Sequence, residues 1–314
     1  MKRDKPRNLP ASVSDRLRTL AHQRQEENQN LLNRYGLERW LYRMSRSAHS
    51  DRFVLKGAML FSLWSDTPHR QTRDLDLLGF GSSSIPELES VIREICAVTV
   101  EPDGLEFLLH SVRGGAIRVE EEYAGVRIKL MAMLGKARIP IQIDVGFGDS
   151  ITPAPEEQTF PTLLDFPAPH LRAYRRETVI AEKFHAMVDI GLSNTRLKDY
   201  FDIRTLAQQF EFEGEILAAA IKATFERRQT PLPSSLPAAL GPQFAADSAR
   251  LKQWTAFLKK NNLPATDASL EETVKLIGEF LMPPVSAINR GENFETTWYP
   301  GGYWQSKSPA KKKT

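Results

Sequence analysis

The most restrictive feature of this 314-residue sequence is a short run of two acids interleaved with leucines, Asp74-Leu75-Asp76-Leu77-Leu78. Alternation with a period of two is typical of a half-buried β-strand, so we expect the carboxylates on one face and the leucines on the other. Like charges held this close repel each other, so folding alone does not favour the pair. Mg²⁺ resolves the conflict because it prefers carboxylate oxygens together with substrate phosphates. The run predicts a metal-binding strand, although such pairs also occur at solvated strand ends.

A second feature precedes the acids. In Phe53–Trp64 an apolar run is followed by a glycine and by apolar residues at helical spacing. This order predicts a strand, a tight turn at Gly57 and a helix. A glycine at such a turn lets backbone N–H groups and a helix N-terminus approach a phosphate. An ordinary strand-to-helix turn is the simpler interpretation of the same pattern.

A third acid lies on a later predicted strand, 139–145. Ile141, Ile143 and Val145 share one face of it, and Asp144 projects from the opposite face. A third carboxylate beside the first pair would complete a two-metal site for in-line displacement at phosphorus. Asp149 lies beyond the alternating run, after a glycine, and is interpreted as a solvated turn residue.

Two further charged clusters lie on predicted helices. Lys183 adjoins the apolar stripe of an amphipathic helix, where its stem could carry the ammonium to a triphosphate. A surface lysine with a partly covered stem is the alternative. In the next helix Asp199 and Asp202 share one face. Asp199 could also be a first-turn acid that the helix dipole favours.

Taken together, these residues resemble the nucleotidyltransferase superfamily and, more fully, the AbiEii/AbiGii toxin family. That family has Lys-Gly-Gly, then Arg-x-Thr/Ser-x-Asp-x-Asp, then a helix with Ala-Glu-Lys, then Lys-Asp-x-x-Asp. The chain has, in the same order, Lys56-Gly57, Arg70-x-Thr72-x-Asp74-x-Asp76, Ala181-Glu182-Lys183 and Lys198-Asp199-x-x-Asp202. Ala58 replaces the second small residue of the turn, usually Gly or Ser, so a serine hydroxyl contact to phosphate is absent.

The resemblance implies a nucleotidyltransferase toxin of a type IV-like toxin–antitoxin pair. Its nucleotide site would contain Lys56, Gly57, Ala58, Arg70 and Thr72. Its metal site, for two Mg²⁺ ions, would consist of Asp74, Asp76 and Asp144. Its catalytic residues would be these three acids together with Lys183 and Asp202. Attack at the α-phosphorus of an NTP would transfer NMP to an RNA acceptor, expected to be the tRNA 3′ end, and block translation. An antitoxin encoded nearby is the expected protein partner. Two alternatives stay open. The enzyme could transfer NMP to the hydroxyl of a small molecule or a protein, or the chain could be a non-catalytic module that binds RNA or a partner.

Composition and charge limit the class of protein and the compartment in which we expect it. The chain is 41% hydrophobic and 26% charged, and its net charge is +3. It shows no leader-like or membrane-length apolar stretch, and Cys96 is its only cysteine, so we expect a cytoplasmic protein without disulfides. Residues 1–24 hold seven Lys/Arg against two Asp. The segment 307–313 holds four lysines and no acid. Such segments either attract phosphate backbones or act as solubilising tails.

The order of the predicted elements gives the architecture. The fold class is α/β (α+β): a nucleotidyltransferase-type small mixed sheet with flanking helices, followed by an all-helical C-terminal region, with the active cleft between them. The expected parts are N-terminal helices in 1–50, the core in 51–165, the helical domain in 166–285 and an extended basic tail in 286–314. Predicted strands include 116–119 and 126–130, with Gly114-Gly115 as a turn. Predicted helices are 85–97, 176–190, 196–209, 213–227, 245–261 and 269–281.

Overall fold

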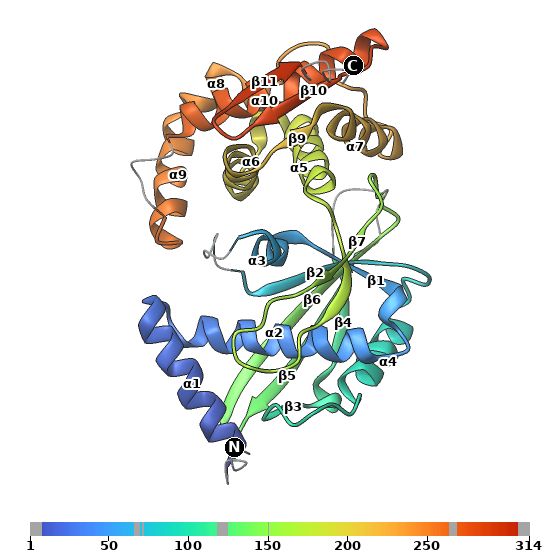
Figure 1. The fold of residues 1–314 in the computed structure, drawn as a ribbon, viewed down its shortest axis with the longest axis vertical. Helices are drawn as coiled ribbons and strands as arrows, with labels where there is room; N and C mark the ends of the chain where they lie inside the picture. Colours follow the sequence, from blue (N-terminus) through green and yellow to red (C-terminus); the bar gives the residue numbers. More distant parts are fainter. Residues whose placement is uncertain are drawn as a thin grey trace, which may run out of the picture. The chain divides into compact units, whose positions relative to one another are not determined.

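The computed structural model describes residues 8–65, 70, 72–117, 125–149, 151–263 and 269–306. It divides into two compact units (Figure 1). The N-terminal unit consists of Met1–Asp149 and Pro155–Tyr174, and the C-terminal unit of Ser150–Ala154 and Arg175–Thr314. No helix in the described part of the chain is both long and apolar enough to cross a membrane.

In its described residues, the N-terminal unit is built on an eight-stranded mixed sheet, which confirms the predicted fold class. Its strands are β1 (Phe53–Lys56), β2 (Asp74–Gly79), β3 (Leu105–Phe107), β4 (Arg113–Ile117), β5 (Gly125–Leu134), β6 (Ala137–Phe147), β7 (Glu156–Thr159) and β8 (His170–Ala173). The order is β3-β5-β6-β2-β1-β8-β7, with β4 also paired to β5. The pairs β2–β6 and β1–β8 are parallel, and the remaining pairs are antiparallel.

The helices of this unit are α1 (Leu9–Arg24), α2 (Asn28–Arg46), the short α3 (Phe61–Trp64) and α4 (Ile85–Cys96). Both α2 and α4 pack on the same face of the sheet: α2 meets Ile139 and Ile141 of β6, and Ile85 of α4 lies against β4 beside Ile128. The buried residues of β5 and β6 are apolar, and they point to this face. Figure 1 shows α2 running across the sheet. Alternation along β5 and β6 therefore gives the sheet one apolar, helix-covered face and one polar face.

Buried charges fix α2 to the loops around it. Arg43 forms an ion pair of 2.7 Å with Asp103, and Arg39 donates two hydrogen bonds of 2.9 Å to the Pro167 carbonyl. Glu38 accepts a 2.7 Å hydrogen bond from the Leu163 amide. Burial raises the pKa of Glu38 to about 7. These contacts join α2 to segments far away in sequence and hold it against the sheet.

The predicted turn at Gly114-Gly115 is wrong, because both glycines lie inside β4. At Gly114 an added Cβ would lie 2.5 Å from a methyl carbon of Ile85, so only glycine lets α4 approach this strand. The amide of Gly114 also donates a 2.7 Å hydrogen bond to Glu89 of α4. The glycine pair thus marks a close helix–strand contact, a role that local sequence does not distinguish from a turn.

The C-terminal unit is mainly helical. Its helices are α5 (Arg176–Ile190), α6 (Leu197–Gln209), α7 (Gly214–Arg227), α8 (Pro242–Ala245), α9 (Ser248–Lys260) and α10 (Leu270–Arg290). Among the described residues, short 3₁₀ segments of both units are Ser50–Arg52, Gly57–Leu60, Leu109–Ser111, Gly191–Ser193 and Ala238–Leu240. A small antiparallel sheet joins β9 (Phe212–Glu213), β10 (Thr296–Tyr299) and β11 (Tyr303–Ser306) in the order β11-β10-β9. Within the segment expected to be an extended tail, 296–306 forms a hairpin.

Helix α10 continues well beyond its predicted end because the hairpin supports it. Pro283 and Pro284 lie inside the helix, and a proline has no N–H for the carbonyl four residues earlier. The Phe280 carbonyl, which loses its helical donor to Pro284, accepts a 3.1 Å hydrogen bond from the Trp304 indole. The Trp304 ring also stacks on the Phe280 ring at 5.8 Å. The hairpin therefore supplies the donor that the helix lacks.

This contact predicts a coupling between Trp304 and Pro284. Trp304→Phe keeps an aromatic ring but removes the donor, and we expect it to destabilise the protein by about 1 kcal/mol. In a Pro284→Ala background the helix can satisfy the Phe280 carbonyl itself, so the same change should cost less. Urea denaturation of the full chain measures all four corners of this double-mutant cycle. A Trp304→Phe effect of equal size in both backgrounds would contradict the assignment.

Candidate active site

The two acids of β2 lie as predicted. Asp74 and Asp76 are half-buried on one face of the strand, and Leu75 and Leu77 are fully buried on the other. Leu78, which the prediction grouped with the other leucines, has the parity of the acids and is buried on their side of the strand. The apolar face anchors the strand, and the acids project from the polar face of the sheet.

The third acid lies beside them. Strand β6 runs parallel to β2, and Asp144 is the register partner of Asp76. Register partners on adjacent strands present their side chains to the same face. The structure therefore places Asp74, Asp76 and Asp144 on one face of two neighbouring central strands, as the alternating patterns predict.

Arg127 of β5 flanks this acid row and was not predicted. It is the register partner of Asp144, and it donates through Nε and Nη2 to the two Asp144 oxygens at 2.8 and 2.6 Å. The hydrogen bond to Asp144, together with the charges of the three acids, raises the pKa of the Arg127 guanidinium. The only local signal in the sequence is the alternation of Arg127 with Val126 and Ile128, which does not identify its partner.

Lys56 flanks the row on the other side. It is the register partner of Asp76 on β1, and its ammonium forms a 2.8 Å ion pair with Asp149. The interpretation of Asp149 as a solvated turn residue is therefore wrong, since its side chain is only 10% exposed. Gly146 leaves room for this pair, because a Cβ there would lie 3.3 Å from the Lys56 ammonium.

The turn after β1 fits tightly against the acids. Gly57 has a φ of +76°, and a Cβ at this position would lie 2.0 Å from an Asp76 carboxylate oxygen. The turn leads into a 3₁₀ segment and the four-residue helix α3 rather than into a long helix. Glycine is thus needed both for the backbone conformation and for contact with Asp76. Ala58 follows in the 3₁₀ segment and is partly exposed.

The residues before β2 also approach the acids. The Thr72 hydroxyl donates a 2.9 Å hydrogen bond to Asp74, which orients this carboxylate. Arg70 is partly exposed, and its neighbours Gln71 and residues 66–69 lie outside the described residues. Thr72 therefore acts on an acid of the row, whereas the resemblance gave it a place in the nucleotide site.

The side chains present fit a hard divalent cation. Asp74 and Asp76 supply carboxylate oxygens, the ligands that Mg²⁺ prefers. Within the described residues, no three His, Cys, Asp or Glu side chains are gathered closely enough to form a metal site. Asp144 is drawn toward Arg127 by its two hydrogen bonds. The carboxylates of Asp74 and Asp76 therefore suit Mg²⁺. The position of the third acid, Asp144, is set by Arg127.

A second cluster of charges lies inside the C-terminal unit, between α5 and α6. The Lys183 ammonium lies 2.6 Å from Asp199 and 2.8 Å from Asp202. Arg196 lies 2.7 Å from the other Asp199 oxygen. Asp199 and Asp202 are fully buried, and the Lys183 side chain is 12% exposed. The expected contact between Lys183 and Asp202 is present, and Asp199 shares it in addition to its place in the first helical turn.

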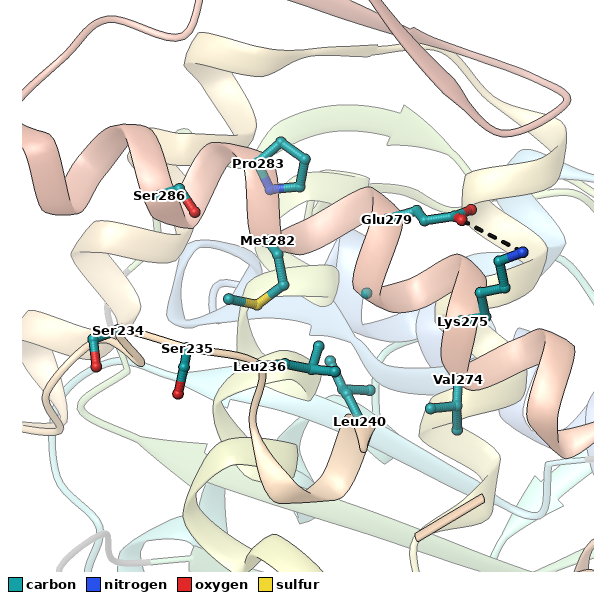
Figure 2. A pocket seen from close by; sticks show the side chains of 11 residues that line it. Ser234, Ser235, Leu236, Leu240, Val274, Lys275, Glu279, Met282, Pro283 and Ser286 are labelled. Atoms are coloured by element: carbon teal, nitrogen blue, oxygen red, sulfur yellow. Dashed lines mark ion pairs between the residues drawn. The ribbon is translucent and has the colours of Figure 1, made fainter. Parts of the chain in front are cut away.

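The C-terminal unit also contains an apolar groove (Figure 2). It has a volume of about 580 Å³ and lies between the segment 234–240 and α10. Leu236, Leu240 and Met282 form much of its lining, and the charged pair at its edge, Lys275 and Glu279, is 3.9 Å apart. The other polar residues of the lining are Ser234, Ser235 and Ser286.

The family that the chain matches gives the class of the protein, a nucleotidyltransferase. The sequence pattern of the nucleotidyl transferase AbiEii toxin family, from type IV toxin–antitoxin systems, matches residues 39–276. This range covers most of the chain, and the protein belongs to that family.

Two solved structures from Helicobacter pylori are similar. JHP933 is 16% identical with a TM-score of 0.47, over 84% of this chain and 95% of that one. A candidate nucleotidyltransferase is 17% identical with a TM-score of 0.47, over 85% of this chain and 100% of that one. No curated protein matches the sequence significantly.

The contact between Gly57 and Asp76 predicts an effect on activity. Gly57→Ala should abolish nucleotide transfer and lower the melting temperature, because the new Cβ collides with the Asp76 carboxylate. Gly81→Ala is the matched control in the same unit: φ there is +91°, but the nearest atom to a Cβ is Arg52 Nη2 at 3.7 Å. Both variants carry the left-handed strain of about 1–2 kcal/mol. Equal activity in the two variants would contradict a special role for the turn.

The Lys183 cluster predicts that this lysine stabilises the fold. Lys183→Met leaves two buried carboxylates without their shared cation and should destabilise the C-terminal unit by about 3–5 kcal/mol. Combining it with Asp199→Asn and Asp202→Asn removes the buried charges and should restore most of the stability. Thermal unfolding of the full chain, with exposed Lys222→Met as control, measures this. A triple variant as unstable as Lys183→Met would contradict the electrostatic explanation.

Proposed function

We propose that this toxin is a Mg²⁺-dependent enzyme that transfers NMP from an NTP to RNA, with the 3′ end of tRNA as the acceptor. The observation that carries the proposal is the row formed by Lys56, Asp76, Asp144 and Arg127 across β1, β2, β6 and β5, with Asp74 on the same face. Acids at the centre suit metal ions, and cations at both ends suit a triphosphate. Blocking the tRNA 3′ end would stop translation, as a toxin requires.

The reaction follows from these groups. Asp74 and Asp76 would hold Mg²⁺, which when bound neutralises charge on the triphosphate. The acceptor hydroxyl oxygen attacks the α-phosphorus, a new P–O bond forms, and the bond to the bridging oxygen of the leaving pyrophosphate breaks. Asp144, held by Arg127, would accept the proton of the hydroxyl or would hold a second ion if one binds. Lys56, Arg70 and the amides of the Gly57–Ala58 turn bind phosphate oxygens, and Thr72 keeps Asp74 in place. Positioning and charge stabilisation supply most of such catalysis.

Lys183 and Asp202 belong to the same proposal. Two carboxylates fix the Lys183 ammonium, so its direction is set before a substrate binds. A lysine held in this way suits a phosphate contact as a point charge. The stability-restoring triple variant separates the two roles: if Lys183 contacts substrate, that variant folds but remains inactive.

The proposed acceptor is supported by the basic charge of two segments, and the proposed protein partner by the family to which the chain belongs. Excess Lys and Arg in 1–24 and in 307–313 supports a polyanionic acceptor such as RNA. Membership of a type IV toxin family supports an antitoxin as the second partner. The site of action is the cytoplasm, which holds both tRNA and NTPs.

The proposal is tested by incubating the protein with total RNA and each α-labelled NTP, with and without Mg²⁺. We expect label in small RNA only with Mg²⁺. Transfer should fall about 10²–10³-fold or more in Asp74→Asn and Asp76→Asn, because each change removes a carboxylate that would hold the Mg²⁺ ion neutralising the triphosphate. Asp15→Asn, at an exposed position, is the control. Label that enters protein or a small molecule instead would overturn the RNA acceptor, and full activity of Asp76→Asn would overturn the metal site.

A further inference from the structure

The polar face of the sheet extends beyond the acid row as an open basic surface. Helices α2 and α4 pack on the opposite face, where the residues of β5 and β6 are buried. On the polar face the same strands leave every described position exposed or half-exposed. Three of the exposed side chains are cations, Arg113 of β4, Lys129 of β5 and Arg138 of β6, and we call them the basic strip.

The register connects the strip to the acids. Arg113 pairs with Lys129, Lys129 with Gln142, and Gln142 with Asp74, so one row crosses β4, β5, β6 and β2. At a strand spacing of 4.7–4.9 Å, Lys129 lies about 10 Å and Arg113 about 14 Å from Asp74 along this row. Arg138 lies four residues from Gln142 along β6, about 13 Å away. The strip therefore begins one or two strands from the candidate active site.

The strip cations are available to an anion. Within the described part of the chain, no carboxylate forms an ion pair with any of the three. Arg113 is held in place by its Nη1, which donates to the carbonyls of His110 and Val112 at 2.8 and 2.7 Å. One exposed acid, Glu106 of β3, pairs in register with Met133, which pairs with Arg138. It therefore lies at the end of the strip farthest from Asp74 and Asp76. Positive charge is thus concentrated toward the acids.

We propose that the basic strip binds the phosphate backbone of the RNA acceptor and leads its 3′ end to Asp74 and Asp76. This inference rests on the proposed function and assigns a surface to its acceptor. The strip spans three strands on an exposed face of the sheet, whereas a small molecule would need an enclosed pocket. The partly exposed Met131 and Met133 of β5, beside these cations, offer apolar contacts to sugars and bases. Arg127 belongs to the acid site because it holds Asp144.

The test is direct RNA binding by fluorescence anisotropy, without NTP, using an RNA hairpin with a single-stranded 3′ overhang. The strip variant combines Arg113→Gln, Lys129→Gln and Arg138→Gln. We expect its affinity to fall ten- to a hundredfold and the slope of log K against log salt to fall by about 2, since each phosphate contact contributes about 0.7. In the transfer assay we expect a raised KM for RNA, with kcat and the KM for NTP little changed.

The control variant removes the same charge from the C-terminal unit through Lys222→Gln, Lys275→Gln and Arg290→Gln, whose side chains are 58%, 75% and 58% exposed. It should bind RNA as the wild type does. Wild-type affinity in the strip variant, equal losses in both variants, or no RNA binding by the wild type would each overturn the strip. If the wild type binds RNA through the strip but transfers no NMP, the proposed reaction fails and the binding surface stands.

Discussion

The structure of the N-terminal unit depends on keeping two carboxylates side by side at the centre of a sheet. Asp76 and Asp144 are partners in a parallel strand pair, so their repulsion has to be offset from both flanks. Arg127 does this on β5 by direct hydrogen bonds, and Lys56 contributes its charge on β1. The surrounding small residues follow from this requirement, because Gly57 and Gly146 leave the space in which these charges pack.

The C-terminal unit also places two acids close together, but there both acids are fully buried. Asp199 and Asp202 are fully buried, and two resident cations, Lys183 and Arg196, satisfy them within the unit. The acid row of the N-terminal unit is half-buried and so retains access to solvent. Full burial favours a permanent partner, because an unpaired buried charge is costly. Partial exposure would suit acids that bind and release an ion, as the proposed function requires.

Local alternation predicted the placement of those candidate-site residues that lie within one element. The period of two gave the face of Asp74, Asp76 and Asp144, and helical spacing put Lys183 and Asp202 on adjacent helices. Contacts set by the register between strands were missed: Arg127 is 17 residues from Asp144, and the pair of Lys56 and Asp149 spans 93 residues. The length of α10 was missed for the same reason, since a distant tryptophan compensates its prolines.

The two faces of the sheet explain why one architecture can provide both stability and a substrate surface. Strands β5 and β6 bury one set of alternate residues under helices, and this set carries the hydrophobic stabilisation. The alternate residues on the other face need not be apolar, and they extend along the whole of β5, which has ten residues, and β6, which has eleven. Because Asp144 and Arg127 belong to this second set, the acid site and the basic strip share one continuous surface. Under the proposed function, a long acceptor would contact the sheet over many residues while only its end reaches the acids.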